Sequence, residues 1–204
     1  MMNWKQLISA KRFGMEEFHE ERQENRSEFQ RDYDRLIFSA PFRRLQNKTQ
    51  VFPLPGSVFV HNRLTHSLEV ASVGRSLGDD VAKALLERHP ELQDSFLPEI
   101  GSIVSAACLA HDLGNPPFGH SGEKAISTFF SEGKGVRLKE KQPNGEQLSP
   151  MEWEDLTHFE GNANAFRILT HQFEGRRKGG FVLTYTTLAS IVKYPFSSSL
   201  AGTK

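Results

Sequence analysis

The alternation of apolar and polar positions predicts a long helix over residues 61–90. Apolar residues recur there at the three- and four-residue intervals of one helix face, at Leu64, Leu68, Ala71, Leu77, Val81 and Leu85. Pro90 cannot continue a helix interior, so we expect the helix to end there. We expect the apolar positions to form the face that packs on the rest of the molecule.

A second helix is predicted over residues 98–114, where "PEIGSIVSAACLAHDLG" is apolar on nearly all sides. Pro98 suits the start of a helix and Gly114 its end. A helix that is apolar all round is typical of the centre of a domain. The chain then breaks at the Pro-Pro pair 116–117, and a third helix is expected from near Ser121. Such a break directs side chains from two helix ends into one space.

The rest of the chain carries weaker signals. The polar stretch around 133–155, rich in Gly and Pro, predicts an exposed, flexible loop. Further helices are predicted over 156–173 and in "TTLASIVKYP", which Pro195 ends. Strand signals are confined to "TQVFP", "SVFVH" and "FVLTY". We therefore expect an all-α fold with at most short β pieces, in which a charged, helical segment 1–31 precedes a domain over 32–204.

The composition narrows the class of protein. The chain has 204 residues and a formal net charge of zero, from 25 basic and 25 acidic residues, so bulk attraction to nucleic acid is not indicated. Cys108 is the one cysteine, which excludes a disulfide within the chain and fits a reducing compartment. The sequence has no signal-peptide h-region and no run of eighteen apolar residues. We expect a cytoplasmic protein that does not cross a membrane.

The first candidate site consists of His66, His111 and Asp112. Asp112 ends the apolar helix, where a charged carboxylate is costly unless it is paired or bound to a metal. His66 lies among the apolar positions of the preceding helix and also needs a partner. Imidazole and carboxylate are ligands for a divalent first-row metal such as Mn, Fe, Co, Ni or Zn, with Mg a weaker fit. Taken singly, His66 reads as a satisfied core histidine, and the His111–Asp112 pair as a helix C-terminal cation with its counter-ion.

A second candidate pair is His120 and Glu123, spaced i, i+3 near a helix start. At that spacing the two side chains can touch. Such a pair can hold a proton for transfer or orient a water molecule near neutral pH. The alternative is a capping arrangement, in which the helix N-terminus stabilises Glu123. Spacing alone does not decide between the two.

The chain resembles the dGTP triphosphohydrolase (dGTPase) family of HD-domain metal-dependent phosphohydrolases. Five blocks carry the resemblance, in the family's order: "DRLIFSAPFRRLQNKTQVFP", "HNRLTHSLEVA", "LAHDLGNPPFGHSGE", "HFEGNANAFRIL" and "LTYTTLASIVKYP". They cover most of residues 32–195. The resemblance implies an all-helical HD-domain bundle that uses a divalent metal ion, Mg, Mn or another first-row metal. It implies hydrolysis of a deoxynucleoside triphosphate (dNTP) to the deoxynucleoside and tripolyphosphate, with dGTP as the expected substrate.

The resemblance also implies roles for individual residues. His66, His111 and Asp112 match metal ligands, and His120 with Glu123 matches the catalytic pair. The positions that match substrate contacts are Gln46, Arg63, His158, Asn162, Lys193 and Tyr194. A triphosphate carries about four negative charges, so a neutral protein needs local cations at the site. Three of these residues have plainer interpretations: a surface ion pair for Arg63, a solvated helix end for Lys193 and a core position for Tyr194.

Family members complete the metal site with a further Asp from a later helix, yet this chain has no Asp beyond Asp155. They also continue well past the "KYP" block. The resemblance therefore implies that residues 1–204 are the N-terminal portion of a longer enzyme, with weak metal binding and little or no hydrolysis alone. Glu160 is the nearest candidate by motif to replace the missing ligand. Family members are commonly oligomeric, so the resemblance further implies a homo-oligomer. The helices that close over the substrate in the family would also leave apolar faces exposed by their absence, and we expect self-association or a partner chain to cover them.

Two alternative functions remain open. Another HD hydrolase, such as a phosphodiesterase or a nucleotidase, needs the metal motif but not the "FRRLQNKTQVFP" and "EGNANAFRIL" blocks. A non-catalytic nucleotide- or DNA-binding module is compatible with the basic clusters "FRRLQNK" and "GRRKGG", which single-stranded DNA can contact. Single-stranded DNA or a dNTP effector therefore joins the dNTP substrate among the expected partners. His120 and Glu123 argue against a purely binding role.

Overall fold

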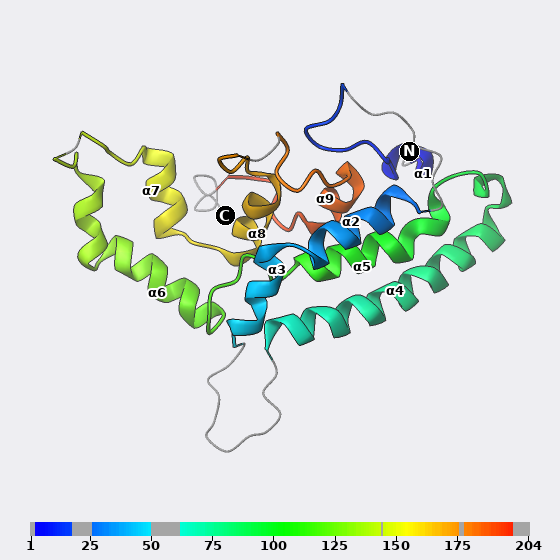
Figure 1. Cartoon of the computed structure of the whole chain (residues 1–204), viewed down its shortest axis with the longest axis horizontal. Coiled ribbons are helices and arrows are strands. Elements are labelled where there is room, and N and C mark those ends of the chain that lie inside the picture. Colours follow the sequence, from blue (N-terminus) through cyan, green and yellow to red (C-terminus); the bar gives the residue numbers. More distant parts are fainter. Residues whose placement is uncertain (1–2, 18–25, 50–61, 144, 176–177, 198–204) are drawn as a thin grey trace, which may run out of the picture.

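Every regular element that the structure describes is a helix, so the prediction of an all-α fold is confirmed (Figure 1). The structure is a computed structural model, and it describes residues 3–17, 26–49, 62–143, 145–175 and 178–197. Within these ranges β pairing is limited to two isolated bridges, Arg12–Thr184 and Thr49–Asn62. The expected strand "FVLTY" does not form. The strand signals of "TQVFP" and "SVFVH" fall mostly on residues 50–61, outside the described ranges.

The α-helices are α1 (Trp4–Leu7), α2 (Glu28–Ile37), α3 (Ala40–Arg44), α4 (Arg63–Arg88), α5 (Ile100–Ala110), α6 (His120–Ser131), α7 (Pro150–Thr157), α8 (Gly161–Thr170) and α9 (Tyr185–Ile191). Four short 3-10 helices connect them: η1 (Leu45–Asn47), η2 (Pro90–Leu92), η3 (Leu97–Glu99) and η4 (Lys134–Lys139). None of the described helices is long and apolar enough to cross a membrane.

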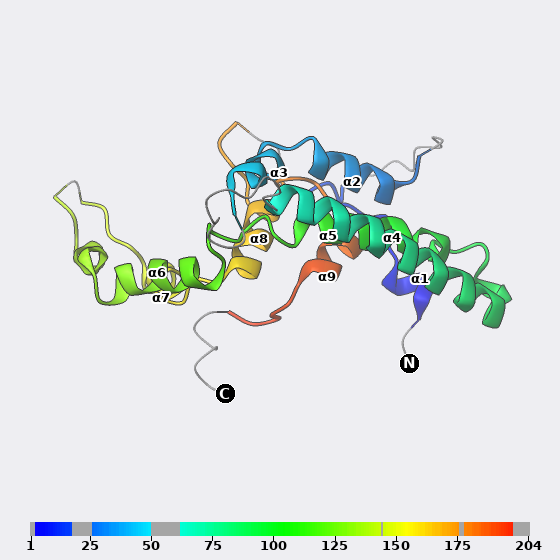
Figure 2. The ribbon, with the colours of Figure 1, turned by 90° about the horizontal axis from the view of Figure 1, so that it is seen from below.

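Helix α5 lies at the centre, packed against α4, α2 and α9, as its all-round apolar sequence predicted (Figures 1 and 2). Leu109 has no exposed surface and joins a core cluster with Leu36, Leu169 and Leu183 from three other parts of the chain. The helix ends at Ala110 rather than at Gly114. The chain tightens there into successive turns, in which backbone N–H groups bond to carbonyls three residues back.

The apolar face predicted for α4 is wrong in its second half. The large side chains of Leu77 and Val81 are 60% and 50% exposed, while Gly74, Gly78 and Ala82 are buried. A Cβ atom built on Gly78 would lie 2.7 Å from the Cα atom of Gly101 in α5. The two helices approach so closely that only small residues fit between them. Periodicity of large apolar residues therefore selected the wrong face.

The segment expected to be a loop, around 133–155, contains η4 and the beginning of α7. Helix α7 starts at Pro150 behind a capping box, in which the side chains of Ser149 and Glu152 each bond to the other residue's backbone N–H. The single helix expected over 156–173 is two helices. Its break lies at Glu160, whose side chain accepts the N–H of Ala163 and so begins α8.

Helices α6 and α7 lie side by side at one end of the molecule, beyond the end of α4 (Figures 1 and 2). Neither helix contains a buried residue. The last helix, α9, ends at Ile191, before the Pro195 that we expected to end it.

The N-terminal segment packs into the same bundle through a buried arginine. The side chain of Arg12 is hydrogen-bonded to Asp32 at 2.6 Å and to the carbonyl of Val182 at 2.7 Å, and it also pairs with Glu28. Asp32 in turn accepts hydrogen bonds from the backbone N–H and the hydroxyl of Thr184. This network joins residues 3–17 to α2 and to the start of α9.

Candidate metal centre and acid–base pair

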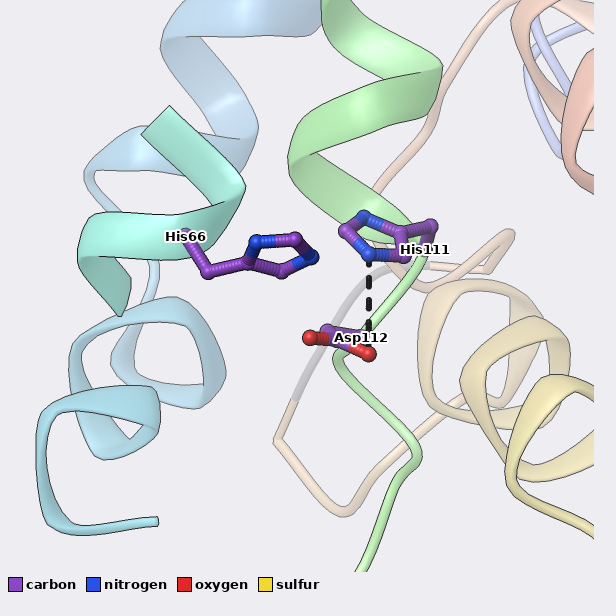
Figure 3. Close-up of side chains that lie close together, drawn as sticks. All are labelled: His66, His111 and Asp112. Carbon is purple, nitrogen blue, oxygen red and sulfur yellow. Dashed lines mark ion pairs between the residues drawn. The ribbon is translucent and has the colours of Figure 1, made fainter. Parts of the chain in front are cut away.

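His66, His111 and Asp112 lie together where the first turn of α4 meets the end of α5 (Figure 3). The two imidazole rings are 5.4 Å apart between centroids and are steeply inclined to each other. One potential ligand atom from each of the three side chains lies within 4.8 Å of the others. The tertiary structure therefore brings together two side chains at the break after α5 and one from a helix 45 positions earlier (66 to 111).

Asp112 presents one carboxylate oxygen that is buried and has no hydrogen-bond partner. Its Oδ1 atom accepts two hydrogen bonds, from Nη1 of Arg63 at 2.8 Å and from Nδ2 of Asn115 at 2.6 Å. Its Oδ2 atom finds no partner among the residues that the structure describes. A buried anionic oxygen without a partner is costly. A cation bound at Oδ2 would remove that cost, which is the first argument that the cluster fits a metal.

His111 has a defined tautomer. Its Nδ1 atom lies 2.6 Å from the carbonyl oxygen of Cys108. Because a carbonyl can only accept, Nδ1 carries the proton, and the lone pair of a neutral ring is left on Nε2. Nε2 lies on the side of the cluster, 3.6 Å from Oδ1 of Asp112 (Figure 3). An N–H bonded to a backbone carbonyl on the far side of the ring is the usual arrangement of a metal-ligating histidine.

The donor set suits Mn, Fe, Co, Ni or Zn better than Mg, because two of its three atoms are imidazole nitrogens. No second carboxylate joins this cluster within the described ranges. Glu160, the candidate for a replacement ligand, uses its two oxygens otherwise. One accepts the backbone N–H of Ala163 and the other accepts the side-chain amide of Asn162 at 2.5 Å.

His120 and Glu123 are paired at the start of α6. Nδ1 of His120 lies 2.8 Å from Oε2 of Glu123, and the His120 side chain is 97% exposed. The other oxygen, Oε1 of Glu123, accepts the backbone N–H of Gly161 at 2.8 Å. Both oxygens therefore have partners other than the N-terminus of α6, and the geometry favours a His–Glu pair over a cap.

The chain reaches α6 through two residues with positive φ. Phe118 has a φ of 66°, and Gly119, the N-cap of α6, has φ 55° and ψ −130°. The second conformation is one that essentially glycine alone adopts. A Cβ on Gly119 would lie 3.4 Å from Nη2 of Arg63, so this turn passes close to the metal cluster.

Of the six residues expected to contact substrate, Arg63 directly contacts the candidate metal centre formed by His66, His111 and Asp112, through its ion pair with Asp112. It is 5% exposed, so the interpretation as a surface ion pair is wrong. Gln46 is exposed on η1, and His158 is exposed at the end of α7 with its Nδ1 3.2 Å from Glu154. Asn162 is half-buried in the first turn of α8.

Lys193 and Tyr194 follow α9, and both are exposed. The core interpretation of Tyr194 is therefore wrong. The ammonium of Lys193 lies 5.1 Å from the centroid of the Tyr194 ring. A hydrogen bond with Tyr194 raises the pKa of Lys193, and the charges of Glu160 and Glu123 raise it further. The Lys193 charge thus acts on the same side of the molecule as the His120–Glu123 pair.

Two residues at the site were missed by the sequence reasoning. Asn115 holds the carboxylate of Asp112, and Nζ of Lys48 donates to the backbone carbonyl of Asn115 at 2.9 Å. Burial lowers the pKa of Lys48, and the positive charge of Arg63 lowers it further. The signal for Lys48 was present in "FRRLQNK", which by itself indicates only a small basic cluster.

Comparison with known proteins shows a match to the HD domain over residues 63–180. The chain is 50% identical to a deoxyguanosinetriphosphate triphosphohydrolase-like protein of Synechocystis sp. over 197 residues, 97% of this chain and 43% of the relative. Identity is 48% to a protein of the same description from Pseudomonas aeruginosa, over 97% of this chain and 42% of the relative. A deoxyguanosinetriphosphate triphosphohydrolase of Yersinia enterocolitica is 38% identical, over 95% of this chain and 41% of the relative. The chain thus spans less than half the length of these curated relatives.

Proposed function

The chain belongs to the HD domain family. We therefore propose that it contributes to the metal-dependent hydrolysis of a dNTP to the deoxynucleoside and tripolyphosphate. Among the dNTPs, we propose dGTP as the preferred substrate. The single observation that carries the proposal is the unpartnered Oδ2 of Asp112, which lies with His66 and His111 at one point of the molecule. The names of the relatives support the nucleotide class of the substrate.

In this proposal His66, His111 and Asp112 hold a divalent ion. Such an ion, when bound, polarises a phosphoryl oxygen and lowers the pKa of a bound water molecule. Arg63 and Asn115 keep the carboxylate of Asp112 turned so that Oδ2 faces away from their own hydrogen bonds. The carbonyl of Cys108 keeps His111 in the tautomer that can act as a ligand.

His120 is the group that moves a proton. The carboxylate of Glu123 is paired with Nδ1 of His120, so Nε2 of His120 is left at the exposed edge of the ring. From there the ring can protonate a leaving oxygen or orient a water molecule at the α-phosphate. The nearby positive charges of Arg63, Lys48 and Lys193 offset the charge of the triphosphate.

We extend the proposal to the partners. The apolar side chains exposed on α4 (Val73, Leu77 and Val81) fit a homo-oligomer. Single-stranded DNA or a dNTP effector fits the basic residues of "FRRLQNK". One of them, Lys48, donates to the backbone carbonyl of Asn115 at the candidate metal centre. A cytoplasmic location fits a dNTP substrate.

Product analysis tests the function. Each dNTP is incubated with the chain and Mn²⁺, and the products are separated by chromatography. We expect at most slow formation of tripolyphosphate and a deoxynucleoside, because two histidines and one aspartate should hold the ion weakly. In a form of the enzyme with measurable turnover, His120→Ala should lower the rate by roughly two powers of ten or more, the usual scale for a positioned proton-transfer group.

The other functional classes give different products. Orthophosphate or a nucleoside monophosphate would place the chain among other HD phosphohydrolases. Saturable binding of nucleotide or single-stranded DNA with no product, even at Mn²⁺ concentrations high enough to fill a weak site, would favour a binding module. Fast release of tripolyphosphate by residues 1–204 alone would contradict the expectation that two histidines and one aspartate hold the ion weakly.

A further inference from the structure

We propose that Asn115 is a positioning residue for the proposed metal ligand Asp112, and that Gly161, at the start of α8, leaves the space that the Asn115 side chain needs for this role. The inference rests on the proposed metal centre, since it concerns how one of its ligands is oriented. Asn115 and Gly161 come from two different blocks of the sequence, and neither was among the residues that the sequence suggested.

Asn115 is held by hydrogen bonds of both its side chain and its backbone. Its Nδ2 atom donates to Oδ1 of Asp112 at 2.6 Å, and its backbone carbonyl accepts from Nζ of Lys48 at 2.9 Å. The carboxylate can only accept, so the amide nitrogen must face Asp112 and the amide oxygen must face away. With Arg63 on the same Oδ1, the carboxylate cannot rotate without losing two charge-assisted hydrogen bonds. Its free oxygen, Oδ2, therefore keeps one direction.

The amide oxygen of Asn115 occupies the space that the Cβ atom of any residue other than glycine at position 161 would need. A Cβ on Gly161 would be 1.9 Å from Oδ1 of Asn115 and 3.0 Å from its Cγ, and it would also lie 2.8 Å from Oε1 of Glu123. The φ of Gly161 is outside the left-handed region, so the backbone tolerates a side chain, and the obstacle is the lack of space. Because residue 161 is glycine, the amide group of Asn115 can lie directly against the backbone at the start of α8.

Helix α8 is held in this position by further contacts. Nδ2 of Asn164 donates to the carbonyl of Gly114 at 2.9 Å, and a Cβ on Gly114 would lie 2.1 Å from the Gly161 carbonyl oxygen. The N–H of Gly161 binds Glu123, the partner of His120. The start of α8 therefore contacts the supports of both the metal ligand and the acid–base pair.

Metal titration of four variants tests the role of Asn115. The probe is Mn²⁺ alone, measured by isothermal titration calorimetry on the 204-residue chain. Loss of an outer-shell partner typically weakens metal affinity by about 10–100-fold, and we expect a change of that size for Asn115→Ala. Asn115→Leu keeps the volume but not the donor, so it should lose as much affinity. Gly161→Ala should also weaken binding, whereas Ala163→Gly, at an exposed position of the same helix, should not.

The double variant decides whether Gly161 acts through Asn115. If it does, Gly161→Ala adds nothing once Asn115 is replaced by alanine, and the double variant binds Mn²⁺ within about twofold of Asn115→Ala, the usual error of additivity. Losses that multiply would show that Gly161→Ala acts through its second close contact, Oε1 of Glu123, or by disturbing α8 in general, and would overturn the role given to Gly161. Parental affinity in Asn115→Ala or Asn115→Leu would overturn the positioning role.

Failure of the metal centre itself would be recognised separately. A parent chain that binds no Mn²⁺ would contradict the proposed function. The Asn115–Gly161 contact is then still tested by thermal unfolding of the metal-free variants. Adding Asn115→Ala should restore part of the melting temperature that Gly161→Ala loses, because the shortened side chain at position 115 leaves room for the new methyl group. No restoration would overturn the contact.

Discussion

At the scale of single residues, the ion pair between Arg63 and Asp112 determines how the site can be studied. The two side chains are 6% and 5% exposed, and their atoms are 2.8 Å apart. Removing one partner of a buried pair commonly costs about 3–5 kcal/mol, because the other charge stays buried alone. Substitution of Asp112 would therefore mix a loss of metal with a loss of stability. His66 offers a cleaner test.

We predict that His66→Ala lowers the affinity for divalent metal by about 10–100-fold or more, since it removes one of the three proposed ligands. His66 is only half-buried and lies outside the Arg63–Asp112 pair, so the fold should remain. Elemental analysis after dialysis against Mn²⁺ measures the bound metal. His171→Ala, at an exposed position after α8, is the matched control. Equal metal content in the two variants would contradict the assignment of the site.

At the scale of the elements, the packing of α4 on α5 depends on small residues. Gly74 faces Cys108, and Gly78 faces the backbone of Gly101, so the helices meet through glycines. Glycine inside a helix costs about 1 kcal/mol relative to alanine, and its presence here needs a reason. The close approach of the two backbones supplies that reason.

We predict that Gly78→Ala destabilises the chain despite its better helix propensity. The new methyl group would lie 2.7 Å from the Gly101 Cα atom and 3.0 Å from its nitrogen. Backbone atoms cannot move aside as a flexible side chain can. Overpacking usually costs about 1–3 kcal/mol, and the gain in helix propensity of about 1 kcal/mol offsets part of that cost. Because the clash is with backbone, we expect a cost toward the upper end and a net fall in the free energy of unfolding of about 1–2 kcal/mol.

Urea unfolding measures the effect of Gly78→Ala. Ser76→Ala, on the exposed side of the same helix, is the control and should stay within about 0.5 kcal/mol of the parent. A variant more stable than the parent would mean that α4 and α5 lie farther apart than the structure shows.

At the scale of the whole molecule, the chain is joined across its length by contacts of the N-terminal segment. Arg12 links α2 to the residues before α9, and the carboxylate of Glu16 accepts a hydrogen bond from the hydroxyl of Tyr185. That bond, together with the N–H of Gly14, lowers the pKa of Glu16 from 4.5 to about 2. Acid should therefore loosen the contact between the N-terminal segment and α9.

We predict that Glu16→Gln reduces the acid dependence of stability. A carboxyl group whose pKa is lower in the folded state stabilises that state above its ordinary value of 4.5. This contribution is lost as the pH falls toward about 2. Melting temperatures measured through that interval should fall less steeply for Glu16→Gln than for the parent, while Glu17→Gln serves as the control. Parallel curves for the parent and Glu16→Gln would contradict the contact.

The amino-acid sequence was enough to predict the all-α class and most of the helices. A helix is a local structure, so periodic apolar positions and breaks at Pro and Gly are enough to locate α4, α5 and α6. It also singled out His66, His111 and Asp112, which the structure places together, because polar side chains that interrupt apolar faces need a shared explanation. Their role as metal ligands remains a proposal.

The buried face of α4, the partner of Arg63 and the direction of the Asn115 side chain became known only from the packed structure. The buried face depends on the distance between α4 and α5, which favours Gly78 over Leu77, and no local pattern encodes that distance. The partners of Arg63 and Asn115 depend on how the end of α5 meets the starts of α4 and α8. Such contacts join residues distant in sequence, and their strength comes from burial, which exists only once the helices have packed.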